Sequence, residues 1–264
     1  MIKLYQAAMS SCTQKVRFVL EQKQLPWEGI TVDLHGAENY SPEFKRINPK
    51  AIIPVLDDDG DLIRESNNIC LYLDEKYPQV TLMPDSLMER SEVRTLCQLI
   101  DEQVHNDSSV CTYAMAFRTR IRATYDDDKK LDVYLADVPD AGRRYTKRQV
   151  IVHGTECPEF EIAVIRLNAM LQMMEDRLQS SKYLVGEQLS IADIVYSPYV
   201  TRLDHLSMET LWSDKPNVAA WYERIQSTRG YEKGMADFFI ADAIKSMRTA
   251  GAQWTDKIQT ITTS

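Results

Sequence analysis

The sequence predicts an α/β domain of about eighty residues, followed by a larger all-helical domain. Two observations predict this division. Short β-type segments alternate with helix-type segments at first, and the dipeptide Tyr77-Pro78 ends that pattern. Beyond it, apolar residues recur at helical spacing without strand signals. We therefore expect domains at 1–78 and 89–264, with 79–88 as the linker between them.

Each element of the first domain has a local signal. Val16, Val19 and Leu20 recur at helical spacing, and Ser41 precedes Pro42 as an N-cap precedes a proline at the first helical position. The expected strands are 2–5, 27–34, 52–56 and 61–64, and the expected helices are 13–23, one beginning at 42, and 66–76. The order βαβαββα describes a mixed four-stranded sheet with helices on both sides.

The second domain is expected to contain long helices, at 90–117, 159–178, 190–205 and 217–227. The segment 118–156 between the first two is rich in arginine and lysine and is interrupted by Asp126-Asp127-Asp128. One interpretation is a solvated helical extension of mixed charge. The other is that part of it closes over a substrate pocket, with an arginine facing an acidic group.

Composition restricts the class of protein. Of the 264 residues, 44% are apolar and 27% charged, as in ordinary soluble proteins, and the net charge of −8 argues against nucleic acid or an anionic membrane as the main partner. The five cysteines lack the spacing of a metal site or a disulfide framework, so no metal is expected. No signal-peptide pattern opens the chain. These features predict a cytoplasmic protein with free thiols.

The turn at Ser10, Ser11 and Cys12 joins a predicted strand to a predicted helix. A helix N-terminus stabilises an anion and lowers the pKa of a nearby thiol. Either Cys12 becomes a thiolate, or a serine hydroxyl bonds the thiolate of a ligand. Simple N-capping is the third interpretation.

Two further segments suggest a peptide-like ligand. Pro54 opens a predicted strand; a trans Ile53-Pro54 bond is the commoner form, whereas a cis bond leaves the backbone of Ile53 free to pair with an extended peptide. Ser66 is expected to be the N-cap of the helix 66–76, where a carboxylate can bind, and Glu65 can receive an ammonium group. Read alone, Glu65-Ser66 also fits an ordinary capped helix. A ligand with a peptide backbone, an α-amino-acid end and a sulfur is glutathione.

The second domain adds a marker at 183–194, YLVGEQLSIADI. Ser190 and Asp193 form a pair like a capping box, and Leu189 with Ile194 fits the hydrophobic staple around it. Together with the three segments of the first domain, this marker makes the chain resemble a cytosolic glutathione transferase. The resemblance covers most of the chain and implies a thioredoxin-like α/β domain followed by an all-α domain.

Three branches of that family are similar to this chain. The turn Met9-Ser10-Ser11-Cys12 with Val16-Arg17 resembles the zeta-type maleylacetoacetate and maleylpyruvate isomerases. The Met-Ser-x-Cys pattern, the segment 43–50 and the charged insertion at 118–156 resemble tetrachlorohydroquinone reductive dehalogenases. The β-etherases, which cleave aryl ethers of lignin, are similar in general architecture.

The resemblance implies that a glutathione thiolate attacks an aromatic or quinonoid electrophile. A reductive dehalogenase or β-etherase activity is expected first, and a cis-trans isomerase of the zeta type is the alternative. A binding protein of the same fold without catalysis is the second alternative. In the dehalogenase scheme Cys12 attacks the glutathione conjugate and Ser10 orients glutathione, whereas Ser11 occupies a position that varies among these relatives.

The resemblance also assigns the remaining candidate residues. Glutathione, the co-substrate, is expected at Lys50, Ile53, Pro54, Glu65 and Ser66. The hydrophobic substrate is expected against Tyr113, Met115 and Phe117. A homodimer is expected, with Asp101 reaching the glutathione of the other subunit.

Overall fold

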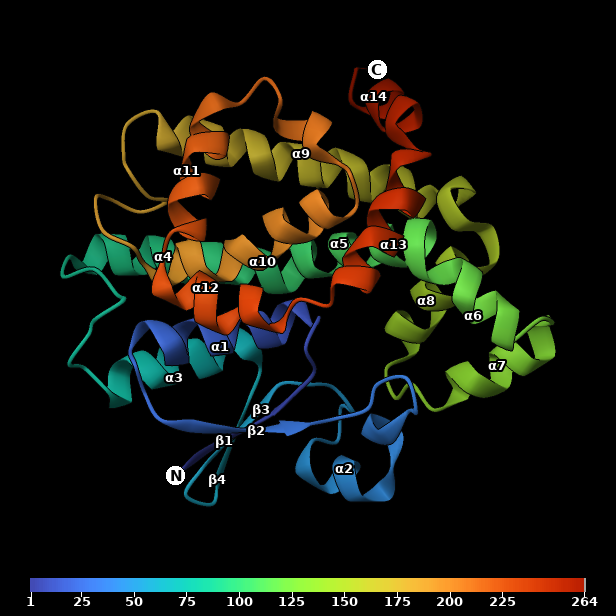
Figure 1. Cartoon of the computed structure of the whole chain (residues 1–264), viewed down its shortest axis with the longest axis horizontal. Helices are drawn as coiled ribbons and strands as arrows, with labels where there is room; N and C mark the ends of the chain where they lie inside the picture. The colour runs from blue at the N-terminus through green and yellow to red at the C-terminus, as the bar shows by residue number, and fades with distance from the viewer. Residues whose placement is uncertain (264) are drawn as a thin grey trace. The chain divides into compact units, whose positions relative to one another are not determined.

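The computed structural model describes residues 1–263 (Figure 1). Contacts divide the chain into two compact units, each assembled from separate stretches of sequence. The first unit contains residues 1–100, 176–198 and 217–240, and the second contains 101–175, 199–216 and the residues from 241 onward. The division of the sequence into 1–78, 79–88 and 89–264 stays a prediction. Within residues 1–263, no helix combines the length and apolar character that crossing a membrane requires.

The first unit contains the four-stranded mixed sheet that the sequence predicts. Its strands are β1 (Ile2–Gln6), β2 (Trp27–Thr31), β3 (Val55–Asp58) and β4 (Asp61–Arg64), in the order β2-β1-β3-β4. β1 pairs parallel with β2 and antiparallel with β3, and β3 pairs antiparallel with β4. The thioredoxin-like fold class is therefore confirmed.

Three of the expected strands have other bounds in the structure: the strand expected at 2–5 ends at Gln6, and the strand expected at 52–56 continues to Asp58. The strand expected at 52–56 begins only at Val55, because the preceding Pro54 has no N–H to donate to a ladder. The strand expected at 27–34 already ends at Thr31. The short hairpin strand at 61–64 and the helix at 66–76 have the bounds that the sequence predicts.

The helices within residues 1–76 lie on the two faces of the sheet. They are α1 (Ser11–Gln22), the 3-10 turn η1 (Glu38–Tyr40), α2 (Pro42–Ile47) and α3 (Ser66–Lys76). Figure 1 shows α1 and α3 on one face of the sheet and α2 on the other. Phe44 of α2 packs in a buried cluster with Val32, Ile53 and Val55. Ser41 caps α2 as predicted, accepting the backbone N–H of Phe44 at 3.1 Å.

Helix α12 approaches the backbone of α1 through two glycines. A Cβ atom at Gly230 would lie 2.3 Å from the ring of Phe18, and one at Gly234 would lie 2.7 Å from the carbonyl carbon of Arg17. Only residues without a side chain allow this separation. The helices that complete the first unit are α4 (Leu87–Leu99), α11 (Pro216–Gln226), α12 (Arg229–Gly234), η6 (Ala236–Phe238) and parts of α9 (Pro158–Leu178) and α10 (Ile191–His205).

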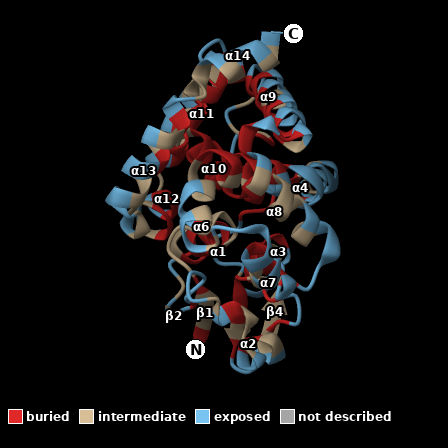
Figure 2. Cartoon of the chain, turned by 90° about the vertical axis from the view of Figure 1, so that its right-hand side faces the viewer, coloured by how far each residue is buried: buried red, intermediate tan, exposed pale blue. Residues whose placement is uncertain are grey.

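Helix α10 starts at the marker recognised in the sequence. Ser190 donates its backbone N–H and its hydroxyl to Oδ2 of Asp193, at 2.9 Å each, so the predicted pair forms. The first half of α10 is buried residue after residue, as the red ribbon in Figure 2 shows. Asp193 also accepts the N–H of Leu184 and the indole N–H of Trp221, at 2.8 and 2.9 Å.

The helix expected at 90–117 is interrupted twice. Five-residue π-helical turns occur at η2 (Ile100–Val104) and η3 (Tyr113–Phe117), on either side of α5 (His105–Thr112). Such turns change which side chains face inward, and they are frequent at functional sites. The second unit also contains α6 (Arg118–Thr124), α7 (Asp128–Ala136), α8 (Ala141–His153), η4 (Gly154–Glu156), η5 (Glu209–Trp212), α13 (Ala241–Ala252) and α14 (Thr255–Thr263).

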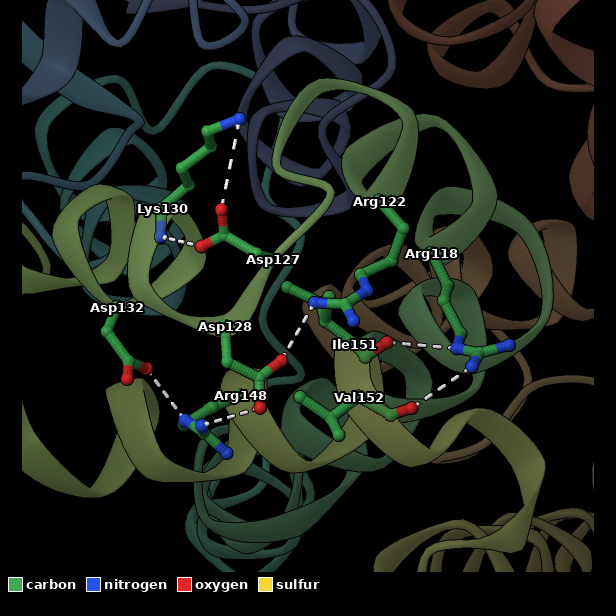
Figure 3. A network of polar contacts seen from close by, with 9 residues as sticks. All are labelled: Arg118, Arg122, Asp127, Asp128, Lys130, Asp132, Arg148, Ile151 and Val152. Atoms are coloured by element: carbon green, nitrogen blue, oxygen red, sulfur yellow. Dashed lines mark hydrogen bonds and ion pairs between the residues drawn. The ribbon is translucent and has the colours of Figure 1, made fainter.

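The charged segment 118–156 folds into α6, α7 and α8, which pair their charges with one another (Figure 3). Asp128 accepts Arg122 at 3.1 Å and Arg148 at 3.3 Å, and Arg148 also binds Asp132 at 2.7 Å. These contacts fit the interpretation of a helical extension of mixed charge.

A second contact fixes the end of α8. The guanidinium of Arg118 donates to the carbonyl oxygens of Ile151 and Val152, at 2.9 and 3.0 Å (Figure 3). Carbonyls in the last turn of a helix lack partners within the helix, and a cation there is favourable. Arg118 therefore joins the first helix of the segment to the last.

Candidate functional site

Strand register brings the three predicted segments to the same end of neighbouring strands in the sheet. Tyr5 pairs with Val55, and Val55 pairs with Arg64, so the end of β1, the start of β3 and the end of β4 lie side by side. The turn at 10–12 follows β1, Ile53-Pro54 precedes β3, and Glu65-Ser66 follows β4. Groups from three separate stretches of sequence therefore border the same end of these strands.

Ser10 is the N-cap of α1. Its Oγ accepts the backbone N–H of Thr13 at 3.3 Å, while Ser11 and Cys12 are the first two helical residues. The capping interpretation of this turn is therefore confirmed for Ser10. Because a hydroxyl accepts and donates at once, capping leaves its proton available to a ligand. Ser10, Ser11 and Cys12 are all half-buried.

Arg17 connects this turn to the rest of the first unit through hydrogen bonds. Its side chain is completely buried and donates to the carbonyl oxygens of Ala8 and Gly234, both at 2.7 Å, and to Oε1 of Gln6. The guanidinium also lies 3.9 Å from the centre of the Phe238 ring. Burial lowers the pKa of Arg17 to about 9, so it is still charged at neutral pH. Five hydrogen-bond donors in a rigid fork allow one side chain to join these groups.

The Ile53-Pro54 peptide bond is cis, so the trans alternative is wrong. The ladder between β1 and β3 stops at Val55, which leaves Ile53 outside the paired residues of the sheet. The side chain of Ile53 packs in the buried cluster with Phe44.

The start of α3 differs from the expectation in one respect. The N-cap is Glu65, not Ser66, and Ser66 is the first helical residue. Glu65 has φ 67°, a conformation that non-glycine residues adopt at a cost of about 1–3 kcal/mol unless the surrounding structure holds them. Such strained residues concentrate at binding sites. The helix still presents unpaired backbone N–H groups beside Glu65.

Two lysines lie at this helix start. The exposed Lys50 pairs with Oε1 of Glu65 at 2.8 Å, and exposed pairs of this kind are broken at a cost of about 0–1 kcal/mol. Lys15 is completely buried and donates from Nζ to Oγ of Ser66 at 3.3 Å and Oδ1 of Asn67 at 3.0 Å. Its ammonium adds positive charge beneath a helix N-terminus that is already positive.

Lys15 and the role of Arg17 were missed from the sequence. Both lie on the predicted amphipathic helix, one on each side of Val16. A basic residue among the apolar positions of a helix is the signal that identifies such groups, because a buried charge requires partners.

The remaining candidates, Asp101, Tyr113, Met115 and Phe117, belong to the second unit. Asp101 is exposed on η2. Tyr113 and Phe117 of η3 are half-buried, and their rings meet edge to face at 5.4 Å between centres. Met115 is only 5% exposed, so it packs in the interior.

The family of the chain follows from comparison with known proteins. A family model for the glutathione S-transferase N-terminal domain matches residues 4–81, and one for the C-terminal domain matches residues 140–224. Together they cover more than half of the chain. The chain belongs to the glutathione S-transferase family. This transferase carries α6 and α7 in the segment 82–139, between the two matched regions.

Three relatives of this transferase are similar to it at 24% to 41% sequence identity. Tetrachloro-p-hydroquinone reductive dehalogenase from Sphingobium chlorophenolicum is 25% identical over 88% of this chain and 94% of its own. Glutathione S-transferase Z1 from Arabidopsis thaliana is 41% identical, over 34% of this chain and 41% of its own. The crystal structure of the β-etherase LigF from Sphingobium sp. strain SYK-6 has a TM-score of 0.79 at 24% identity, over 88% of this chain and 98% of its own.

Proposed function

We propose that this transferase uses the glutathione thiolate to attack an aromatic or quinonoid electrophile, as a reductive dehalogenase or as an enzyme that cleaves aryl ethers. The observation that carries the glutathione part is the shared strand end of Ser10–Cys12, Ile53-Pro54 and Glu65-Ser66. The similarity to a reductive dehalogenase and to a β-etherase over most of the chain supports the electrophile class.

In this proposal the α-amino-acid end of glutathione binds at the start of α3. Its ammonium group displaces Lys50 from Glu65, and its carboxylate meets the helix N-terminus above the Lys15 ammonium. The backbone of Ile53 pairs with the peptide portion. The sulfur lies at the start of α1, where Ser10 donates its hydroxyl proton and the helix dipole favours the thiolate.

The first chemical step is common to both activities. The thiolate forms a carbon–sulfur bond, and the halide or aryloxide leaves with the bonding electron pair. In the dehalogenase, the thiolate of Cys12 then attacks the conjugate sulfur; the carbon–sulfur bond breaks and the carbon takes a proton. A second glutathione reduces the mixed disulfide, so two glutathione molecules are oxidised for each reduced product.

The test compares a halogenated hydroquinone, a β-aryl ether and maleylpyruvate as substrates of wild type and of Cys12→Ser, with Ser11→Ala as the matched variant in the same turn. A dehalogenase in which Cys12 is replaced accumulates the glutathionyl conjugate. If all three substrates are turned over at the wild-type rate by Cys12→Ser, Cys12 has no covalent role and the dehalogenase scheme is wrong.

The second candidate is a zeta-type isomerase, favoured by the similarity to glutathione S-transferase Z1 over 90 residues. Here the thiolate adds to a double bond and leaves after rotation, so maleylpyruvate is the substrate consumed. A protein that is retained on immobilised glutathione without forming the thiolate absorbance would instead be a binding protein. We further propose a cytoplasmic homodimer in which Asp101 reaches the glutathione of the other subunit.

A further inference from the structure

A cluster of aromatic rings surrounds Lys147, a lysine on α8 of the charged segment 118–156, which is called the extension below. We name the rings and the lysine together the Lys147 cluster; it consists of Tyr113, Phe117, Tyr125, Tyr134 and Lys147. The ammonium of Lys147 lies 5.0 Å from the centre of the Tyr113 ring and 5.2 Å from that of Tyr134. It also donates to the Tyr134 hydroxyl at 3.3 Å. A residue of α8 thus contacts an expected substrate-binding residue of η3.

The rings of the Lys147 cluster keep part of their surface open. Tyr125 stacks on Tyr134 with 4.5 Å between ring centres, and Tyr113 meets Phe117 edge to face. All four rings and Lys147 are half-buried, unlike Met115 on the same π-helical turn. Partly exposed aromatic residues beside an ammonium suit a ligand that is itself aromatic.

The extension holds Lys147 in place. Arg148, its neighbour in sequence, binds Asp128 and Asp132 of α7, while Arg118 of α6 holds the carbonyls at the end of α8 (Figure 3). Consecutive residues point about 100° apart around a helix. Arg148 can therefore bind the acidic residues of α7 while Lys147 faces the tyrosines.

A second cation acts on Tyr113. Arg202 of α10 is only 6% exposed and interacts electrostatically with Tyr113 and Tyr199. Burial lowers the pKa of Arg202 to about 10, so it remains charged at neutral pH. Although the chain as a whole carries a net charge of −8, the ammonium of Lys147 lies over the ring of Tyr113. Such local fields, not net charge, attract small anions.

We propose that Lys147 and Tyr134 bind an anionic substituent, a carboxylate or a phenolate, on the aromatic substrate, whose ring packs against Tyr113 and Phe117. Lys147 thereby selects acidic aromatic substrates over neutral ones of the same shape. The ammonium and the tyrosine hydroxyl donate to the oxygen of the substituent, and charge-assisted hydrogen bonds of this kind are the stronger ones. This proposal rests on the proposed function, because it names the class of electrophile that the transferase accepts.

A purely structural role for Lys147 predicts something different. If its ammonium only joined α8 to η3 through the rings of Tyr113 and Tyr134, its loss would disturb binding of every substrate alike. Selectivity between an acid and its neutral analogue separates the two roles.

The test uses a chlorodinitrobenzoate and its methyl ester, which share the ring and the reacting carbon; the acid is anionic and the ester is neutral, and each is compared between variant and wild type. Lys147→Met keeps an unbranched side chain that is one heavy atom shorter and removes the charge. We expect kcat/KM for the acid to fall about tenfold, mainly through KM, and that for the ester to change less than about twofold. Lys147→Arg should restore preference for the acid. The control is Lys130→Met, an exposed lysine of the same extension that pairs with Asp126, and it should leave both values unchanged.

Equal losses for acid and ester in Lys147→Met, or no loss for the acid, would overturn the proposal. Binding of an unreactive dinitrobenzoate and its ester, measured by equilibrium dialysis, separates this failure from failure of the proposed function. If wild type turns over neither chloro compound but Lys147→Met still weakens benzoate binding about tenfold, the anion site stands and the transferase activity toward aryl halides does not. If wild type turns over both chloro compounds without preferring the acid, the transferase activity toward aryl halides stands and the anion site does not.

Discussion

Replacing Asp193 with alanine is expected to bring the protein close to unfolding. The Asp193 side chain is fully buried and accepts four hydrogen bonds between 2.8 and 2.9 Å. Its Oδ1 accepts the backbone N–H of Leu184 and the indole N–H of Trp221, and its Oδ2 accepts the N–H and the hydroxyl of Ser190. Alanine leaves all four donors without that acceptor.

The magnitude follows from these four contacts. Hydrogen bonds to a charged group contribute about 1.5–3 kcal/mol each, but four bonds to one carboxylate do not add independently. Burial raises the pKa of Asp193, which offsets part of their contribution. Each buried donor left without an acceptor costs about 1–3 kcal/mol, and whole domains are stable by only about 5–15 kcal/mol. We therefore expect Asp193→Ala to lose about 4 kcal/mol.

Urea unfolding followed by tryptophan fluorescence measures this loss, since Trp221 donates directly to the carboxylate. Asp193→Asn keeps the shape but turns an amide N–H₂ toward two donors, so it should be nearly as unstable. Ser190→Ala removes only one donor and should cost about 1 kcal/mol. A free energy of unfolding for Asp193→Ala within about 1 kcal/mol of wild type would refute this reasoning.

Three further predictions concern other parts of the chain. A Cβ atom at Gly251 would lie 1.7 Å from the carbonyl oxygen of Leu206, so Gly251→Ala should cost more than about 3 kcal/mol in urea unfolding. Gly142→Ala, where the nearest atom is 3.5 Å away, should not lower stability, because alanine is also the better helix former. Burial, aided by neighbouring cations, lowers the pKa of His205 to about 4. Below pH of about 6.5 the unfolded chain therefore binds a proton that the folded chain does not, and the free energy of unfolding falls by about 3 kcal/mol as the pH drops to about 4. His205→Gln should lack this part of the acid sensitivity, and equal sensitivity in both proteins would contradict it. Arg17→Lys keeps the charge but loses the planar fork, so we expect kcat/KM with glutathione to fall about tenfold, and an unchanged value would argue against a positioning role.

Local signals predicted the elements whose boundaries depend on a few neighbouring residues. The N-cap Ser41 before Pro42 and the bounds of α3 are of this kind. The helix expected at 90–117 illustrates the limit, because π-helical turns occur at η2 and η3 inside it. Apolar spacing is nearly the same in α and π segments, so packing against other elements decides between them.

The candidate glutathione site likewise has features that local sequence predicted and features that it did not. Residue types at three turns indicated its parts, and Ser10 caps α1 as one of the interpretations of its turn predicted. The strained backbone of Glu65 was not predicted, because Ser66 is the better N-cap by residue type. Held in place by neighbouring structure, such a conformation has no signature in a short stretch of sequence.

The sequence by itself determined the order of strands and helices, the residue types at the three turns and the start of α10, since each depends on a few neighbouring residues. Only the tertiary structure decided what surrounds them. Arg17 finds its acceptor Gly234 on a helix 217 positions away, and Lys147 finds Tyr113 on a different helix. A buried or half-buried charge is stable only with such partners, and the fold alone determines which residues they are.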